Sequence, residues 1–557
     1  MTSSRRTSQS RRWRNVALYA ALIGTIALSG ASVARATTIT VDSLSDDTNA
    51  GHCTLREAIN SANQAGSTGS CDLGTSTDTI QFNVTGTINL VDTLPAITSG
   101  TTLTITGPTT SSSGIIIDGN SSVQILRVSS GGTLTLQYLT LQNGSVTGAS
   151  GPSGGDGDGG AVQNQGTLTT NNCTLSNNHA TGGEGTSGQG GSGRGGGIFN
   201  AGTLSISGST LASNETIGGK TDPDPPYPGS GLGGAIYASS GTMTVITNTT
   251  LSQNSASSAG GAVNVLGGTV TITNATFVAN SAGCCVHMPN FGNAILNDGV
   301  VNVRGTIFGG NGQGACAGTV VNDVGYNIAA QYTSYPSGTY PECYLASPTS
   351  QSLPLAQIGL SSGLADNGGP TQTIALGPGG GANTFIPAAS CTDQSPTPHQ
   401  LTTDQRGFPR PAASHSGFCS AGAFEYGDSA PTSTPTGTPT ATPTPTPPTV
   451  PAVVHVSKTS VNFGRVKIGK SKTSVVKLTN TSKKGGATVS FSGATFTRSS
   501  SDFSVSTTCL RAVPPKKQCT VTLGFAPTAV GPESATVTVY SDASNSPQAI
   551  GVTGTGK

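Results

Sequence analysis

The stretch that decides the fold repeats six times between residues 133 and 311. Its copies read TLTLQYLTLQNG (133–144), TLTTNNCTLSNN (167–178), TLSISGSTLASN (203–214), TMTVITNTTLSQN (242–254), TVTITNATFVAN (269–280) and VVNVRGTIFGGN (300–311). The alternation of apolar and polar residues is typical of short strands, and no helical period is present. The final Asn residues of the last five copies recur every 26 to 40 residues, a spacing that indicates stacked structural units.

A Gly-rich element precedes each of the last five copies: GGAV (159–162), GGIF (196–199), GGAI (233–236), GGAV (260–263) and GNAI (292–295). Units of two or three short strands stack as a parallel β-helix. We therefore predict an all-β fold, a right-handed parallel β-helix of the pectate-lyase-like kind. Side chains two apart share a face, which predicts one inward column: Leu141, Leu175, Leu211, Leu251, Phe277 and Phe308.

Two further features of the repeat have structural explanations. Cys173 falls in a second inward column of mostly small residues and is predicted to be a buried, free packing thiol. The Asn that ends most copies is predicted to form a ladder of side-chain amides along the stack. Repetition of this Asn favours a scaffold role over a catalytic one.

The composition excludes several classes of protein. Of 557 residues, 79 are Gly and 32 are Pro, while charged residues make up 9% and aromatic residues 5%. So few charged residues exclude a coiled coil and a highly charged disordered chain.

The N-terminus predicts export. Five Arg residues precede an apolar run, Val16 to Leu28, and Ala34-Arg35-Ala36 offers small residues for cleavage. The run is shorter than the roughly 20 residues that span a bilayer, so we predict a signal peptide over 1–36 and an extracellular or cell-surface location. An uncleaved anchor is the alternative. No membrane span is expected in the mature chain.

Cysteine usage agrees with export. Four pairs lie close in sequence and are disulfide candidates in an oxidising compartment: Cys53 with Cys71, Cys316 with Cys343, Cys391 with Cys419, and Cys509 with Cys519. The pairing of Cys284 and Cys285 stays open. None of the spacings is that of a zinc site.

Charge is divided unevenly along the chain. Residues 37–452 hold 7 Lys and Arg against 22 Asp and Glu, whereas 453–557 hold 13 against 3. The basic segment is suited to an anionic surface such as a cell envelope, although a merely solvated face is the simpler interpretation. Nucleic acid is not an expected partner of an exported chain with so acidic a body.

Insertions between each Asn and the next Gly-rich element are predicted to crowd one face, which is often the binding face of a repeat fold. Candidate ligand-binding residues on these insertions are Asp156, Asp158, Glu184, Arg194, Asp222, Asp224 and Tyr227. Asp156 and Asp158 are a candidate calcium site, because hard cations take carboxylate oxygens. A simple Gly/Asp turn is the alternative, and no cofactor is required. Tyr227 is suited to stacking on a sugar ring or to covering the wall of the β-helix.

The beginning of the mature chain carries a recognisable motif. Thr54 and Glu57 in CTLREAI (53–59) fit a capping box, so a short helix is expected to cover the open end of the stack. The motif resembles CSLREA, found at the start of secreted bacterial β-helix proteins. The GGA[ILV] and F-x-x-N elements resemble the repeats of chlamydial polymorphic outer membrane proteins, which are adhesins.

The C-terminal half resembles two further modules. DNGGPTQT (366–373), TDQRGFPR (403–410) and GAFEY (422–426) are together similar to the choice-of-anchor Q domain. This resemblance implies that Asp404 and Arg406 order a turn. VNFG (461–464), FAPT (525–528) and GVTGTG (551–556) resemble the ASH-type, choice-of-anchor D immunoglobulin-like domain. The implied domains are a β-helix (37–352), a closing module (353–426), a Pro/Thr-rich linker (427–452) and a β-sandwich (453–557).

These features favour a secreted or cell-surface protein for adhesion or glycan binding, without catalysis. The expected partner is an extracellular polysaccharide or a cell-envelope component, and a monomer is expected. The alternative is a polysaccharide lyase or glycoside hydrolase, which rests on analogy of fold alone. No catalytic residue is identified, because no pair of carboxylates or Ser-His constellation emerges from the motifs.

Overall fold

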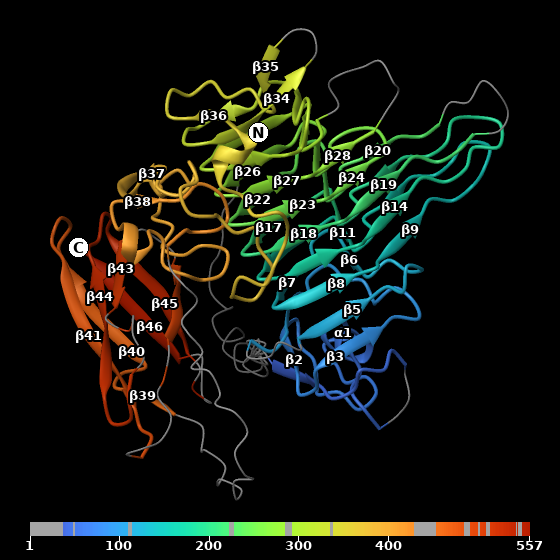
Figure 1. Cartoon of the computed structure of the whole chain (residues 1–557). Coiled ribbons are helices and arrows are strands. Elements are labelled where there is room, and N and C mark those ends of the chain that lie inside the picture. The colour runs from blue at the N-terminus through green and yellow to red at the C-terminus, as the bar shows by residue number, and fades with distance from the viewer. Residues whose placement is uncertain are drawn as a thin grey trace, which may run out of the picture. The chain divides into compact units, whose positions relative to one another are not determined.

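The computed structural model of the protein is shown in Figure 1. It describes residues 37–47, 51–109, 114–221, 228–283, 292–334, 338–427, 453–483, 489, 491–498, 502–507, 509, 513–541, 543 and 548–557. The chain divides into two compact units, Met1–Thr434 and Pro435–Lys557, which are described separately. The predicted signal peptide and residues 428–452 of the predicted linker lie outside the described residues. Within the described ranges, no helix is both long and apolar enough to cross a membrane.

Three long sheets form the walls of unit 1 (Figure 1). The first contains, in order, β1 (Thr37–Val41), β2 (Thr77–Phe82), β4 (Thr102–Thr106), β7 (Thr133–Gln137), β12 (Thr167–Asn171), β17 (Thr203–Ser207), β22 (Met243–Thr247), β26 (Thr269–Thr273), β30 (Val300–Arg304) and β33 (Asn322–Asp323). The second contains β3 (Gly86–Asn89), β5 (Ile115–Asp118), β8 (Leu139–Gln142), β13 (Thr174–Ser176), β18 (Thr210–Ala212), β23 (Thr250–Ser252), β27 (Thr276–Val278), β31 (Ile307–Gly309), β34 (Ile328–Ser334), β35 (Gly338–Pro341) and β36 (Gln351–Pro354).

The third wall contains β6 (Leu126–Val128), β11 (Val162–Asn164), β16 (Ile198–Asn200), β21 (Ile236–Ala238), β25 (Val263–Val265), β29 (Ile295–Asn297) and β32 (Cys316–Gly318). Successive coils pair in parallel in all three walls, and only the β34–β35 hairpin is antiparallel in them. From the coil that contains β4, β5 and β6 to the coil that contains β30, β31 and β32, each coil thus adds one strand to each wall. This arrangement confirms the predicted parallel β-helix.

The register stacks equivalent residues of successive coils into interior columns. Leu141 pairs with Leu175, Leu175 with Leu211, and the column continues through Leu251 to Phe277 and Phe308. All six side chains are fully buried, and the two Phe rings stack with centroids 5.2 Å apart. The predicted inward column is therefore confirmed.

One corner of the β-helix requires the left-handed backbone in coil after coil. It joins the first wall to the second, and φ is 54° at Tyr138, 55° at Asn172 and 59° at Gly208. Asn and Gly tolerate this conformation best, which explains why Asn248, Asn274 and Gly305 occupy the same corner farther along. Tyr138 is therefore an unusual occupant.

Helix α1 (Leu55–Gln64) lies at the N-terminal end of the stack (Figure 1). The predicted capping box is present, because Thr54 accepts a hydrogen bond from the Glu57 N–H and Glu57 accepts one from Thr54. Leu55, Ala58, Ile59 and Ala62 are buried in the same core as the first strands. The amphipathic face thus covers apolar residues that the first coil would otherwise expose.

Residues 355–427 contain little regular structure: α2 (Leu355–Ile358), β37 (Ile386–Pro387), the 3-10 turns η1 (Ala388–Ser390) and η2 (Ala413–His415), and β38 (Phe418–Cys419). This segment runs along the side of the β-helix. Thr371 Oγ1 donates to the Gly208 carbonyl, Asn248 Nδ2 donates to the Thr403 carbonyl, and the Gly422 N–H donates to the Gly305 carbonyl. The segment is thereby fastened to several coils and belongs to unit 1.

Unit 2 is a β-sandwich of two four-stranded sheets. One sheet contains β39 (Val454–Val456), β41 (Lys472–Asn480), β44 (Gln518–Phe525) and β43 (Phe503–Thr507). The other contains β40 (Ser460–Val466), β46 (Gln548–Gly556), β45 (Gly531–Ser541) and β42 (Phe491–Arg498). Phe463, Phe503 and Phe525 stack in the core between the sheets.

Four disulfides join the four expected pairs: Cys53–Cys71, Cys316–Cys343, Cys391–Cys419 and Cys509–Cys519. Cys173 is a free thiol that is fully buried, and burial raises its pKa to about 12. A thiol with so high a pKa is a poor nucleophile near neutral pH, which agrees with the packing role. Cys284 and Cys285 lie outside the described residues.

Candidate functional site

The insertions leave the β-helix at the same corner and stack on one another as a thin projection, here called the fin (Figure 1). Strands leading into it form one parallel sheet: β9 (Ser145–Thr147), β14 (His179–Thr181), β19 (Glu215–Ile217), β24 (Ser255–Ala256) and β28 (Ser281–Ala282). Returning strands form a second: β10 (Gly157–Asp158), β15 (Gly193–Arg194) and β20 (Gly231–Leu232). The insertions thus continue the regular stacking of the coils.

Glycine allows the two layers of the fin to touch through their backbones. The Gly183 N–H donates to the Gly155 carbonyl, and the Gly191 N–H donates to the Gly183 carbonyl. A Cβ atom at Gly191 would lie 1.8 Å from the Gly155 carbonyl oxygen, so no other residue fits there. The Gly-rich composition of the insertions therefore serves close packing.

Three of the predicted ligand-binding residues form one ion-pair cluster at the base of the fin. The Arg194 guanidinium lies 2.8 Å from an Asp156 carboxylate oxygen and 2.7 Å from an Asp158 oxygen. Asp156 also accepts a hydrogen bond from the Ser192 N–H. The guanidinium supplies positive charge to both carboxylates, so a calcium ion would have to compete with it for them. No ion is tested at this pair, and calcium binding stays a prediction. The described residues hold no group of three or more metal-ligating side chains.

Arg194 also covers two stacked aromatic rings. Phe199 and Tyr237 stack with centroids 5.5 Å apart, and the guanidinium carbon lies 5.1 Å and 5.7 Å from the two centroids. Burial alone would lower the pKa of Arg194, but Asp158 and Asp156 raise it above its ordinary value. The cluster is thus a closed structural unit in which charges and rings are already paired.

The structure does not test the remaining predicted ligand residues. Glu184 is exposed on the fin, whereas Asp222, Asp224 and Tyr227 lie outside the described residues. Ligand binding by these residues therefore stays a prediction.

The repeated Asn residues form a buried ladder along the stack. Asn178 Nδ2 donates to Asn214 Oδ1 at 2.8 Å, and the chain continues through Asn254 and Asn280 to Asn311 at 2.9 Å per step. Glu342 follows in the next coil and accepts from the N–H groups of Asn311 and Gly312. Burial raises the pKa of Glu342. The ladder has a scaffold role, as its repetition indicated.

A buried ionic cluster lies within the segment formed by residues 355–427. Asp404 accepts hydrogen bonds from the N–H groups of Arg406, Phe408 and Glu425, and from the Arg406 guanidinium. That guanidinium lies between the Phe408 and Phe424 rings, 4.1 Å and 3.6 Å from their centroids. The side chains of Asp404 and Arg406 are almost fully buried, so they contact no solvent-borne substrate and hold a turn in place.

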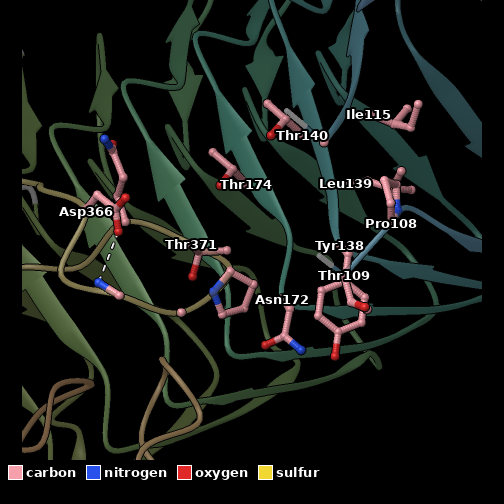
Figure 2. Close-up of a pocket in the computed structure, with 15 residues that line it drawn as sticks. Pro108, Thr109, Ile115, Tyr138, Leu139, Thr140, Asn172, Thr174, Asp366 and Thr371 are labelled. Carbon is pink, nitrogen blue, oxygen red and sulfur yellow. Dashed lines mark hydrogen bonds between the residues drawn. The ribbon is translucent and has the colours of Figure 1, made fainter. Parts of the chain in front are cut away.

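A groove of about 770 Å³ lies between the side segment and the second wall of the β-helix (Figure 2). The β-helix contributes Tyr138, Thr140, Asn172 and Thr174, and Pro108 lies at its far end. The loop Asp366–Gln372 forms the opposite side, where Asp366 accepts a hydrogen bond from the Gly368 N–H at 3.0 Å. This volume falls within the roughly 300–1,000 Å³ of small-molecule sites.

The lining of the groove is rich in hydroxyl and amide groups and poor in charge. Its only ionisable acid among the described residues is Asp366, and it contains neither Lys nor Arg. Residues 110–113, which lie outside the described residues, are Thr-Ser-Ser-Ser and contain no carboxylate. Glycoside hydrolysis canonically uses two carboxylates, and the described lining contains one, that of Asp366.

The sequence interpretation missed this groove. Tyr138 is the one available signal, because it places an aromatic ring at a corner that Asn172 and Gly208 occupy in the following coils. In the sequence, Asp366 stood out only as the first residue of DNGGPTQT (366–373), a motif similar to the choice-of-anchor Q domain. Their proximity depends on the path of residues 355–427, which no repeat pattern predicts.

Together the two units define a parallel β-helix protein with a C-terminal immunoglobulin-like domain. The family model described as ASH (Abnormal spindle-like microcephaly-assoc'd, ASPM-SPD-2-Hydin) matches residues 451–549, which identifies the sandwich as an ASH domain. No curated protein matches the chain.

Solved structures give weak similarities. The ASH/PapD-like domain of human CEP192 is 15% identical over 22% of this chain and 94% of its own, with a TM-score of 0.16. A protein of unknown function from Porphyromonas gingivalis W83 is 12% identical over 19% of this chain and 46% of its own, so less than half of that protein is spanned; the TM-score is 0.16. The secreted serine protease VesC from Vibrio cholerae is 12% identical over 19% of this chain and 23% of its own, with a TM-score of 0.16.

Proposed function

We propose that this chain is an exported, non-catalytic glycan-binding protein of the bacterial surface or its surroundings, and that the groove beside Tyr138 is its binding site. The observation that carries the proposal is the lining of the groove: one aromatic ring, several hydroxyl and amide groups, and a single carboxylate. Sugar rings present hydroxyl groups and an apolar face, and such a lining offers partners for both.

Several features support export and adhesion. The predicted signal peptide and the four disulfides agree with an oxidising compartment. The resemblances to CSLREA, choice-of-anchor and polymorphic-outer-membrane-protein sequences favour a surface protein. A monomer is expected, with an extracellular polysaccharide or a cell-envelope component as its partner.

The charge of the groove narrows the class of glycan. Asp366 is the only charged side chain in the described lining. Polyanionic chains such as uronates would meet a carboxylate and no compensating cation. The groove is therefore suited to neutral or amino-bearing polysaccharides. The same lack of a second carboxylate and of a cation disfavours the glycoside hydrolase and the polysaccharide lyase.

The experiment uses residues 37–557 and a panel of neutral polysaccharides, so that the basic ASH domain does not retain the protein by charge. Retention and new sugar ends are measured on one sample. Tyr138→Asn removes the ring but keeps a residue that tolerates the corner, as Asn172 does. Asp366→Asn removes the charge but keeps an acceptor for the Gly368 N–H.

We expect Tyr138→Asn to weaken retention about tenfold or more, which corresponds to a stacking contact of about 1.4 kcal/mol. Tyr344→Asn is the matched control, because Tyr344 is 67% exposed and does not line the groove. Equal retention of wild type and both groove variants would assign binding to another surface. New reducing or unsaturated sugar ends would show that the protein is an enzyme and would contradict the proposed non-catalytic function.

A further inference from the structure

The described surface of the ASH domain is strongly basic. Its exposed cations are Lys458, Arg465, Lys467, Lys470, Lys472, Lys477, Lys483, Lys516, Lys517 and Lys557. The acids in the described part of residues 453–557 are Asp502, which is buried and bonded to Thr528, and Glu533, which is half-buried. A surface with this balance attracts anionic partners.

The cations form two groups at opposite ends of the sandwich. Val466 at the end of β40 and Gly531 at the start of β45 both pair with Gly556 of β46, so the loops 467–471 and 526–530 flank the same strand end. The end they form is here called the tip. The Ile468 N–H donates to the Lys557 carbonyl. Cations at the tip are Arg465, Lys467, Lys470, Lys472 and Lys557.

The tip also exposes two aliphatic side chains. Ile468 is 48% exposed between Lys467 and Lys470, and Val530 is 75% exposed on the loop on the other side of β46. Neither residue belongs to the apolar core of the sandwich. Lys472 Nζ is the one tip ammonium with a described bond, which it donates to the Phe463 carbonyl at 3.0 Å.

We propose that the tip docks on an anionic lipid bilayer, with Ile468 and Val530 entering the headgroup region and the surrounding Lys and Arg side chains contacting lipid phosphates. Basic and aliphatic residues together are what interfacial membrane binding requires, since apolar burial and electrostatic attraction add. A soluble polyanion would use the cations but would leave both aliphatic side chains in water. This proposal does not depend on the groove.

The opposite end of the domain provides a control of equal charge. Lys458 precedes β40 and Lys517 precedes β44, and both are exposed. Strands β40 and β44 end at the tip, so these two residues lie away from it. Reversing both changes the net charge as much as reversing Lys467 and Lys470.

The experiment is sedimentation of residues 37–557 with vesicles of phosphatidylcholine alone or mixed with phosphatidylglycerol. Residues 1–36 are omitted because the apolar run Val16–Leu28 would itself enter lipid. The variants are Lys467→Glu with Lys470→Glu, Ile468→Ser with Val530→Ser, and the control Lys458→Glu with Lys517→Glu. Exposure of all six side chains keeps the cost to folding small.

We expect wild type to bind the mixed vesicles in a salt-sensitive way and to bind phosphatidylcholine at least tenfold more weakly. Both tip variants should lose about tenfold or more in affinity, and the control should lose markedly less. Absence of binding to the mixed vesicles overturns the proposal, as does an equal loss in tip and control variants. Full binding by the double Ser variant, with competition by soluble dextran sulfate, would identify a polyanion site instead.

Discussion

At the scale of single residues, the amide ladder ends at a buried carboxyl group, that of Glu342. Glu342 is 4% exposed and accepts the N–H groups of Asn311 and Gly312, yet burial still raises its pKa. The sequence predicted the ladder because Asn recurs at one position of the repeat. It did not predict Glu342, which lies beyond the last repeat and follows no period.

The raised pKa of Glu342 predicts a pH-dependent contribution to stability. Above the ordinary value of 4.5, the folded chain holds this proton more tightly than the unfolded chain does, so stability falls as pH rises through the raised pKa. Glu342→Gln removes that dependence. The difference in melting temperature, wild type minus variant, should decrease from pH 4 toward neutral pH.

Melting curves of both proteins at several pH values check this expectation. Asp298→Asn, at an exposed carboxylate of the same β-helix, is the control for general charge effects. If the difference in melting temperature between wild type and Glu342→Gln is constant with pH, the pKa of Glu342 is not raised in the folded chain.

At the scale of elements, the fin shows what a sequence pattern conveys and what it omits. The common entry corner of the insertions predicted that they crowd one face, and the parallel order of β9, β14, β19, β24 and β28 agrees. The pairing of Arg194 with Asp156 and Asp158 was not predicted, because it depends on register between coils 36 residues apart. The same carboxylates suggested calcium when considered one insertion at a time.

Gly191→Ala should disrupt the fin without unfolding the β-helix. The added Cβ would lie 1.8 Å from the Gly155 carbonyl oxygen, so the two layers must separate. We expect new proteolytic cleavage within 145–158 and 179–195 under conditions where the wild-type fin is resistant. Mass spectrometry of a brief protease digest locates and quantifies the new cleavage sites.

Gly283→Ala is the matched control, because Gly283 also lies in an insertion and a Cβ there meets nothing within 4 Å. Equal cleavage of both variants would mean that backbone contact does not hold the fin together.

At the scale of the whole molecule, two units have separate apolar cores. The β-helix buries aliphatic columns from Ile39 to Cys343, whereas the ASH domain packs its own Phe cluster. The sequence predicted both folds because each is encoded locally, by repeats in one case and by alternating strands in the other. It could not predict the groove, since the path of 355–427 depends on long-range bonds such as Thr371 to Gly208.

Separate cores predict independent unfolding. Calorimetry of 37–557 should show two transitions that match those of 37–427 and 453–557 measured alone. Replacing Cys509 and Cys519 by Ala should lower only the ASH transition, by about 2–4 kcal/mol of unfolding free energy. Replacing Cys53 and Cys71 by Ala should lower only the transition of the β-helix unit. One shared transition would contradict this independence.

The Asn ladder gives the molecule a chemical direction. Each Asn amide of the ladder donates one N–H toward the C-terminal coil, to the next Asn or to Glu342, and a second N–H to a backbone carbonyl of the preceding coil. The bonds between side chains therefore all run in one direction. Glu342 meets the electropositive end of this row and, when ionised, has no hydrogen to pass onward. The row of side-chain hydrogen bonds can therefore extend through any number of coils that carry this Asn. It ends at the first carboxylate, so a single residue sets its length.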